Sequence, residues 1–260
     1  MKLATWNVNS LNARLPHLLR WLGDSRVDLL GLQELKLTDD KFPRDDLLAE
    51  GYEAESFGQK TYNGVALLAG GQLRDVQRNI PGFDDEQARV IAATTDSPLG
   101  ELRVINAYFV NGQEPGSDKF AYKMRWLSAL TAWVRAELAR HPRLVLMGDF
   151  NIAPDDADSY DPVGLAGTIH HTDEERAAFR DLLALGLVDA FRLFEQAPKS
   201  FSWWDYRMLG FQKNRGLRID IMLVSQPLVP HVTSCSIDRA PRKWEKPSDH
   251  TPVVLTLGQP

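Results

Sequence analysis

The sequence predicts an α/β fold in which β-sheets lie inside and helices lie outside. Short apolar runs alternate with amphipathic stretches along most of the 260 residues. Within the apolar runs, polar and apolar residues alternate less strictly than in a sheet with one wet face, so both faces should be covered. No Pro-, Gly- or Ser-rich linker divides the chain, and we therefore expect one domain over residues 1–260.

Apolar runs of strand length predict the sheets, and residues 3–6 end a further strand near the N-terminus. The runs are residues 27–33, 64–68, 90–94, 102–108, 144–147, 219–225 and 252–257.

Three amphipathic stretches predict helices over residues 11–22, 119–140 and 173–185. Thr172 precedes the last of these, and Glu175 follows it three positions later, which is a capping-box pattern. Gly186 lies where that helix should end.

The composition is that of an ordinary globular protein, with 43% hydrophobic and 25% charged residues. There is no apolar run long enough to cross a bilayer and no signal-like N-terminal segment, so a membrane is not an expected partner. Cys235 is the only cysteine, which excludes an internal disulfide and fits a reducing compartment. We expect a cytoplasmic protein.

The net charge of −5 and the pI near 5.7 argue, at face value, against nucleic acid as a partner. Two basic segments soften this objection, residues 199–218 and residues 239–246. A charge run is usually a solvated face. Each of these runs, however, lies beside one of the polar motifs described next, which favours a role in facing phosphate.

Polar groups stand at strand ends, where a packed core would not select them. Taken singly, each has an ordinary explanation as a helix cap or turn residue. Asp220 is harder to dismiss, because a carboxylate inside an apolar strand is costly unless it is paired. The groups are Asn7, Asn9, Glu34, Asp149, Asn151, Asp220, Asp249 and His250.

Carboxylates, amides and one imidazole together predict a site for a hard cation and a phosphate. Oxygen ligands suit Mg²⁺ or Mn²⁺, whereas one obvious histidine and a lone cysteine do not suit Zn²⁺.

At this point the sequence resembles the exonuclease III family of the endonuclease/exonuclease/phosphatase superfamily, from residue 1 to about residue 257. The most specific matches are the Trp-Asp-Tyr-Arg segment at 204–207 and the Asn-Arg-Gly-Leu-Arg-Ile-Asp segment at 214–220. The resemblance implies a four-layered αββα sandwich, in which two packed mixed β-sheets are flanked by helices. The other matching segments are residues 6–9, 32–36, 64–68, 106–108, 148–151, 201–203 and 247–250.

The resemblance also implies roles at the site. Glu34 matches the family's principal metal ligand, with Asn7, Asp249, Asp149, Asn151 and His250 as further candidates. Asp149, helped by Asn151, is expected to orient and deprotonate the attacking water. Asp220 is expected to hold the His250 imidazolium against a phosphate oxygen, and Tyr108 to point its hydroxyl at the phosphate or leaving group.

The implied substrate is duplex DNA with abasic sites or 3′ ends, cut by water to leave 3′-hydroxyl ends, and we expect a monomer. Lys60 and Tyr62 lie in a segment that resembles a loop along the phosphate backbone. Trp203 matches a position that lines the sugar pocket, and Arg207 falls in the loop that enters the groove. Of Trp203 and Trp204, we expect one to be packed in the core.

His170 departs from the family pattern, because relatives commonly carry a small residue such as serine there. One interpretation is an exposed loop histidine. The other is steric: an imidazole at the rim of the pocket would hinder an internal abasic sugar from flipping in and so favour 3′ ends.

Two rival functions share part of this pattern. A superfamily phosphoesterase acting on inositol phosphates or sphingomyelin would share Glu34, Asp149 and His250 but not the two specific segments. A non-catalytic DNA-binding relative would have lost at least one of Glu34, Asp149, Asp220 and His250. The sequence leaves open how abasic-site incision, 3′-exonuclease and 3′-phosphatase activities are balanced.

Overall fold

The computed structural model describes residues 1–258, and its core is a pair of six-stranded sheets packed face to face. The first sheet has the strand order β13-β14-β1-β2-β4-β3, and the second has the order β5-β6-β7-β8-β12-β9. Each is mixed, because β1–β2 and β7–β8 are parallel pairs among antiparallel ones. The strands of the first sheet are β1 (Lys2–Asn7), β2 (Leu29–Gln33), β3 (Glu53–Phe57), β4 (Val65–Ala69), β13 (Val232–Ile237) and β14 (Val253–Leu257).

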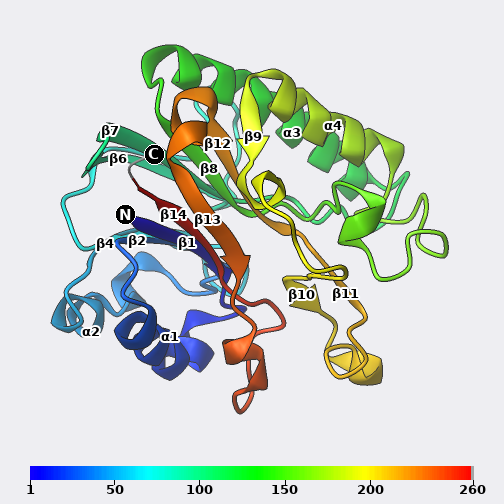
Figure 1. The fold of residues 1–260 in the computed structure, drawn as a ribbon, viewed down its shortest axis with the longest axis horizontal. Helices are drawn as coiled ribbons and strands as arrows, with labels where there is room; N and C mark the ends of the chain where they lie inside the picture. The colour runs from blue at the N-terminus through cyan, green and yellow to red at the C-terminus, as the bar shows by residue number, and fades with distance from the viewer. Residues whose placement is uncertain (259–260) are drawn as a thin grey trace.

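The second sheet lies above the first in Figure 1, and a two-stranded ribbon projects beside the pair. That ribbon consists of β10 (Trp203–Trp204) and β11 (Gly216–Leu217). The strands of the second sheet are β5 (Arg74–Arg78), β6 (Val90–Ser97), β7 (Gly100–Tyr108), β8 (Leu144–Asp149), β9 (Leu187–Asp189) and β12 (Asp220–Ser225).

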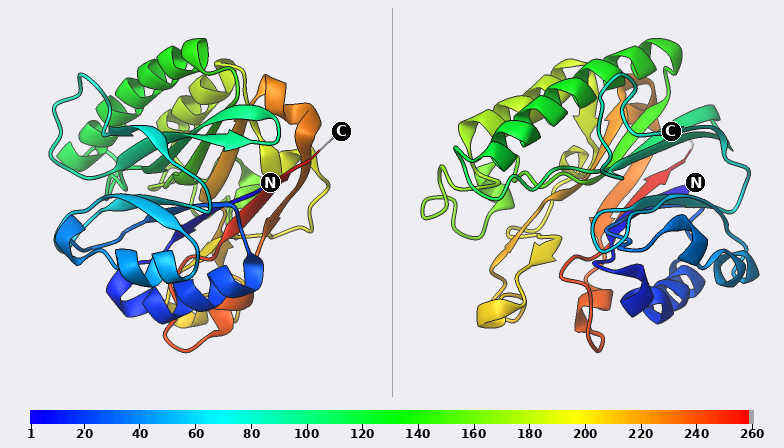
Figure 2. Two further views of the ribbon diagram at one scale, coloured as in Figure 1. Left: turned by 90° about the vertical axis from the view of Figure 1, so that its left-hand side faces the viewer. Right: turned by 180° about the vertical axis from the view of Figure 1, so that it is seen from behind.

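Helices cover the two outer faces, as the views in Figure 2 show. α1 (Leu11–Ser25) and α2 (Arg44–Ala49) pack on the first sheet, and α3 (Asp118–Arg140) and α4 (Asp173–Ala184) on the second. The predicted four-layered sandwich is therefore confirmed. Short 3₁₀ turns lie at Asp39–Lys41, Asp156–Asp158, Ala190–Leu193, Arg207–Leu209, Gln226–His231 and Ala240–Lys243.

Three apolar clusters correspond to the three interfaces between the four layers. The strands that lie centrally, β2, β4, β8 and β12, are buried at every position, which explains their nearly continuous apolar sequences. Of the helices among residues 1–258, none combines the length and the apolarity that a membrane crossing requires.

The predicted strands and helices are present, with ends that differ by a few residues. Residues 27–28 precede β2, for example, and α1 continues to Ser25. The predicted capping box is present: Thr172 Oγ1 accepts from the Glu175 amide at 3.1 Å, and the Glu175 carboxylate accepts from the Thr172 amide at 3.1 Å. Gly186 follows the helix with a φ of 93°.

Candidate active site

Strand ends from both sheets place the candidate residues at one end of the sandwich. β1 ends at Asn7 in register with Gln33 on the parallel strand β2, so the next residue, Glu34, lies beside Asn7. In the second sheet, Asp149 at the end of β8 pairs with Tyr108 on one side and with Asp220 on the other. The strand order therefore brings together residues that are more than 200 positions apart in the sequence.

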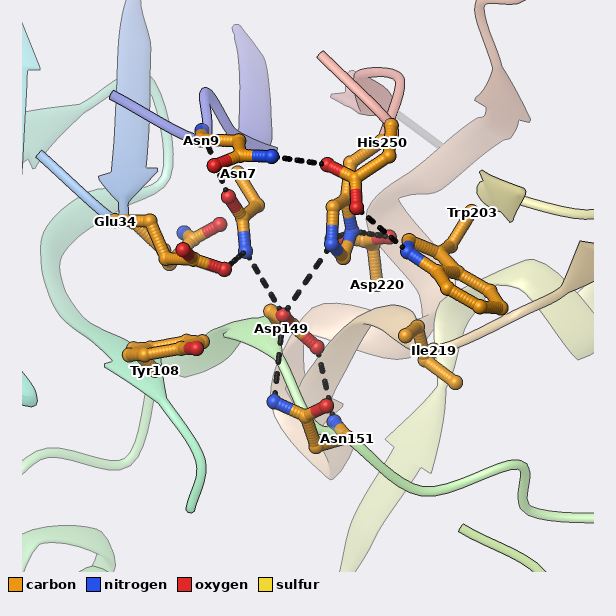
Figure 3. Close-up of polar contacts among 12 residues, drawn as sticks. Asn7, Asn9, Glu34, Tyr108, Asp149, Asn151, Trp203, Ile219, Asp220 and His250 are labelled. Atoms are coloured by element: carbon orange, nitrogen blue, oxygen red, sulfur yellow. Dashed lines mark hydrogen bonds and ion pairs between the residues drawn. The ribbon is translucent and has the colours of Figure 1, made fainter. Parts of the chain in front are cut away.

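Asn7 joins the two sheets at the centre of this site (Figure 3). Its Nδ2 donates to Glu34 Oε1 at 2.9 Å and to Asp149 Oδ2 at 2.9 Å. One potential ligand atom each from Glu34, Asp149 and His250 lies within 4.8 Å of the other two. The carboxylates of Glu34 and Asp149, which come from different sheets, thus face a shared space, and the Asn7 side-chain amide lies between them.

The predicted contact between Asp220 and His250 is present. Nδ1 of His250 lies 2.9 Å from Asp220 Oδ2, and its Nε2 lies 3.7 Å from Asp149 Oδ2. Burial alone would lower the pKa of His250, but the Asp220 and Asp149 carboxylates outweigh it and raise the pKa to about 10. His250 is therefore an imidazolium at neutral pH, with Nδ1–H donating to Asp220.

Asp149 is buried and lies among other anions. Burial raises the pKa of its carboxyl group to about 7, the His250 imidazolium opposes the rise, and Asp220 adds to it. Its Oδ1 accepts from the Asn151 backbone N–H at 2.9 Å, which fixes the carboxylate plane. Burial, with Glu34 and Asp149 nearby, also raises the pKa of Tyr108 well above its usual value, so the phenol stays protonated.

The backbone at the site adopts conformations that ordinary residues avoid. Glu34 has a φ of 54° and Asn151 a φ of 49°, both in the left-handed region. Gly148 has a φ of 147°, and a Cβ there would lie 1.9 Å from the Ala107 carbonyl oxygen. The glycine therefore lets β8 approach β7 closely just before Asp149.

Asp249 lies apart from the three converging ligand atoms. Its Oδ1 accepts from Asn9 Nδ2 at 2.9 Å, and its Oδ2 accepts from Trp203 Nε1 at 3.0 Å. Asn9 in turn accepts from Lys36 Nζ at 2.6 Å, and Lys36 pairs with Glu34 at 2.8 Å. These contacts connect Asp249 to the acidic centre through neighbouring side chains.

Sequence reasoning placed Asn9 among the polar groups at strand ends but gave it no role of its own. It missed Lys36, and it missed Asn111 and Lys123, which both contact Asn151. Asn9 and Lys36 each follow a predicted site residue by two positions, which was a usable signal. Lys123 falls on the apolar side of a predicted amphipathic helix, where a lysine is unexpected.

The candidate DNA-binding side chains lie at the surface. Lys60 and Tyr62 are exposed, and Arg207 is exposed but paired with Asp205 at 2.6 Å. Trp203 is partly exposed whereas Trp204 is fully buried, so the expectation that one of the two is packed in the core is confirmed.

The interpretation of the basic segments needs a partial correction. Arg218, between β11 and β12, is buried in ion pairs with Asp158 and Asp189. Arg242 is buried against the rings of Trp204, Tyr206 and Phe211. Neither guanidinium is free to face phosphate.

His170 is not an exposed loop histidine. It is partly buried, and its Nδ1 lies 2.6 Å from the Asn151 carbonyl oxygen. Burial and the nearby Lys123 lower its pKa to about 4, so the ring is neutral and Nδ1 carries the proton that the carbonyl accepts. Together with Trp203 and Leu217, His170 lines a cavity of about 820 Å³.

The donor set fits a hard divalent cation. Glu34 and Asp149 converge with His250, and Asp149 is a buried carboxyl group whose ionisation is costly without a further positive charge. Carboxylate and amide oxygens are the ligands that such a cation prefers.

An acidic centre that can hold a divalent cation beside a protonated imidazole is suited to hydrolysing phosphate esters, and the fold and site together define a metal-dependent phosphoesterase. The chain belongs to the Endonuclease/Exonuclease/phosphatase family, which matches residues 4–250.

Within that family the chain is an exonuclease III-type nuclease. It is 38% identical to exodeoxyribonuclease III of Haemophilus influenzae, over 97% of this chain and 98% of that protein. A 3′ phosphatase from Neisseria, solved with a product DNA hairpin, is 47% identical, with a TM-score of 0.96 and 99% of both chains covered. An AP endonuclease from Archaeoglobus fulgidus is 33% identical, with a TM-score of 0.94 and 99% of both chains covered.

Proposed function

We propose that this protein is a Mg²⁺-dependent DNA-repair nuclease that hydrolyses phosphate esters at DNA 3′ ends in preference to internal abasic sites. The convergence of Glu34, Asp149 and His250 around Asn7 is the observation that carries the hydrolytic part. Mn²⁺ could replace Mg²⁺, because both prefer oxygen ligands. We further propose that the chain acts as one domain and a monomer on duplex DNA in the cytoplasm.

The metal ion would be held mainly by Glu34, with Asn7, Asp149, Asn151, Asp249 and His250 as further candidate ligands. When bound, it would polarise the scissile phosphate and stabilise the leaving oxygen.

The protein's own side chains would divide the remaining work. Asp149, with a pKa near neutrality, would accept a proton from the attacking water while the Asn151 backbone N–H holds its carboxylate. The His250 imidazolium, held by Asp220, would donate from Nε2 to a phosphate oxygen. Tyr108 would donate its hydroxyl proton toward the phosphate or the leaving group.

The preference for 3′ ends rests on His170. Its ring occupies the wall of the cavity that Trp203 also lines, and its contact with Asn151 fixes it there. An internal abasic sugar must leave the helix to enter this cavity, whereas a 3′-terminal group need not. The Neisseria relative that is 47% identical is described as a 3′ phosphatase, which supports the same direction.

For DNA contact, we propose Lys60 and Tyr62 on the backbone side, Trp203 against the terminal sugar, and Arg207 in the groove. Arginine and lysine supply the phosphate contacts on which affinity depends.

One enzyme preparation should be compared on matched duplexes that carry a 3′-phosphate, a recessed 3′-hydroxyl and an internal abasic analogue, with Mg²⁺ and with excess chelator. We expect the 3′-phosphate to be removed fastest and the chelator to abolish every activity. Equal rates on all three duplexes would contradict the 3′ preference, and activity in chelator would contradict the metal.

The His170→Ser variant tests the specificity part separately. It should raise the ratio of abasic incision to 3′-phosphate removal, whereas His141→Ser at the end of α3 should not. An unchanged ratio would show that His170 has no part in the preference.

A further inference from the structure

A lysine ammonium is buried directly beneath the candidate active site. Lys123 projects from α3 and is fully buried. Its Nζ donates to the Asn151 carbonyl at 2.8 Å and to the Asn111 carbonyl at 3.2 Å, and it forms an ion pair with Glu175. One cation therefore ties the loops that follow β7 and β8 to the first turn of α4.

Burying the Lys123 ammonium costs free energy of folding, and an apolar side chain at this position would avoid that cost. Lys123 shares the buried side of α3 with Phe120, Leu127 and Leu130, so a leucine or methionine would suit the pattern. Burial lowers the pKa of Lys123, and Glu175 opposes that shift. A buried ion pair is often no more stabilising than an apolar replacement, so stability alone does not account for this lysine.

The hydrogen bonds of Lys123 connect it, through Asn151, to Asp149, the proposed general base. The Asn151 backbone carbonyl also accepts from His170 Nδ1 at 2.6 Å, while the Asn151 backbone N–H donates to Asp149 at 2.9 Å. Asn111 Nδ2 donates to the Asn151 side-chain oxygen at 3.2 Å. Because Asn151 has a φ of 49°, its peptide orientation is strained and needs partners to hold it.

We propose that Lys123, paired with Glu175, is a positioning residue that holds Asn151 in its strained conformation and thereby aims Asp149 at the attacking water. The proposal rests on the roles assigned above to Asp149 and Asn151. Because Lys123 is fully buried, it would act through Asn151 rather than by contact with the substrate. Its removal should therefore lower kcat, because small displacements of catalytic groups are costly, and leave KM for DNA nearly unchanged.

The same helix supplies a matched control. Glu137, toward the other end of α3, forms a buried ion pair with Arg103 at 2.6 Å, away from the site. Its removal has the same kind of cost for folding without a bond to Asn151.

The experiment measures kcat, KM and unfolding on the same preparations, with a 3′-phosphate duplex and at a temperature where every variant is folded. Lys123→Met should lower kcat by about 10²-fold, the scale expected for a misplacement of about 1 Å. Glu137→Gln should lose stability and keep kcat. If Lys123→Met keeps the wild-type kcat, the proposal is wrong.

A second variant separates the ammonium from the carboxylate left behind. In Lys123→Met/Glu175→Gln no unpaired buried charge remains, and the side-chain oxygen of the introduced glutamine can still cap α4. Stability should recover relative to Lys123→Met while kcat stays low. Recovery of kcat would overturn the proposal, because the defect would then come from the unpaired Glu175. If Lys123→Met fails to fold, kcat of the double variant tests the proposal in its place.

Asn151→Ala is the reference for the proposed function. If it is impaired and Lys123→Met is not, only the positioning role fails. If Asn151→Ala keeps the wild-type kcat, the role assigned to the Asn151 side chain fails, whereas the route through its backbone carbonyl and N–H is still decided by Lys123→Met.

Discussion

Asp220 begins an apolar strand, and its carboxylate is almost entirely buried. Such a group needs a partner, and His250 provides one at 2.9 Å. The same contact keeps the imidazole protonated and fixes which nitrogen faces the site. At the scale of single residues, one buried ion pair thus accounts both for a charge inside a strand and for a protonated imidazole whose Nε2 faces Asp149.

The pair predicts a pH dependence. The pKa of His250 is 6.5 in the unfolded chain and is raised to about 10 in the folded protein. The contribution of the protonated imidazole to the free energy of unfolding is therefore fully present below pH 6.5 and is lost as pH rises through about 10. Asp220→Asn should lower the pKa of His250 and move the alkaline fall of kcat to lower pH, with a rate loss of orders of magnitude. The pH–rate profiles of both proteins test this, and superimposable profiles would refute the coupling.

Glu34 predicts a metal dependence. Its carboxylate is paired with Lys36 at 2.8 Å and is one of three converging candidate ligands. Glu34→Gln removes the charge and keeps the shape, so we expect weaker Mg²⁺ binding and partial rescue of the rate at high Mg²⁺ or Mn²⁺. Titration calorimetry with Mg²⁺ alone measures the first effect. Glu55→Gln, on the exposed edge strand β3, is the matched control.

Sequence reasoning found the ionisable groups of the site and the contact between Asp220 and His250, but not the other connections among them. Asp149, Asp220 and His250 were recognisable because charged groups at the ends of apolar strands are unusual. The link from Lys123 to Asn151 was not recognisable, because it depends on how α3 lies against the loop after β8. Every residue has a backbone carbonyl, so the sequence does not show which of them a buried lysine will contact.

At the scale of elements, burial decides which strands a sequence reveals. The central strands were predicted because both of their faces are apolar. Strands β3, β5, β9 and β13 were missed, and all four are sheet edges. β5, for instance, reads Arg-Asp-Val-Gln-Arg, which is typical of an edge that must not pair with another chain.

Helix α4 carries a local prediction. Thr172 caps its N-terminus through a reciprocal pair with Glu175, which also receives Lys123. Thr172→Ala should lower the free energy of unfolding by about 1 kcal/mol, because one helix amide loses its acceptor. Thr172→Ser retains the hydroxyl and should be close to wild type. Equal urea midpoints for the alanine and serine variants would contradict the role of the cap.

At the scale of the whole molecule, two buried amides hold the sheets together beside the site. Asn106 Nδ2 donates across the interface to the Leu32 carbonyl at 2.9 Å, and its Oδ1 accepts from Gln33 Nε2 at 2.6 Å. Gly31 leaves the necessary space, because a Cβ there would lie 2.7 Å from the Asn106 side chain. The relative position of the two halves of the active site is thus set by hydrogen bonds as well as by apolar packing.

The net charge of the chain determines how it can bind DNA. A chain with a net charge of −5 repels DNA at long range, so binding must depend on local cations that contact phosphate. Arg207 is the exposed candidate beside the β10–β11 ribbon, whereas the exposed Arg135 lies on α3, away from it (Figure 1). The affinity for a 3′-phosphate duplex should be measured in Ca²⁺ over a range of salt concentrations. The logarithm of the association constant should fall linearly with the logarithm of the salt concentration.

Arg207→Ala should weaken that affinity and reduce the salt slope by about one, the change expected for one lost phosphate contact. Arg135→Ala removes the same charge from the total and should leave the slope unchanged. If both variants shift the affinity equally without changing the slope, DNA responds to the net charge alone and Arg207 makes no phosphate contact.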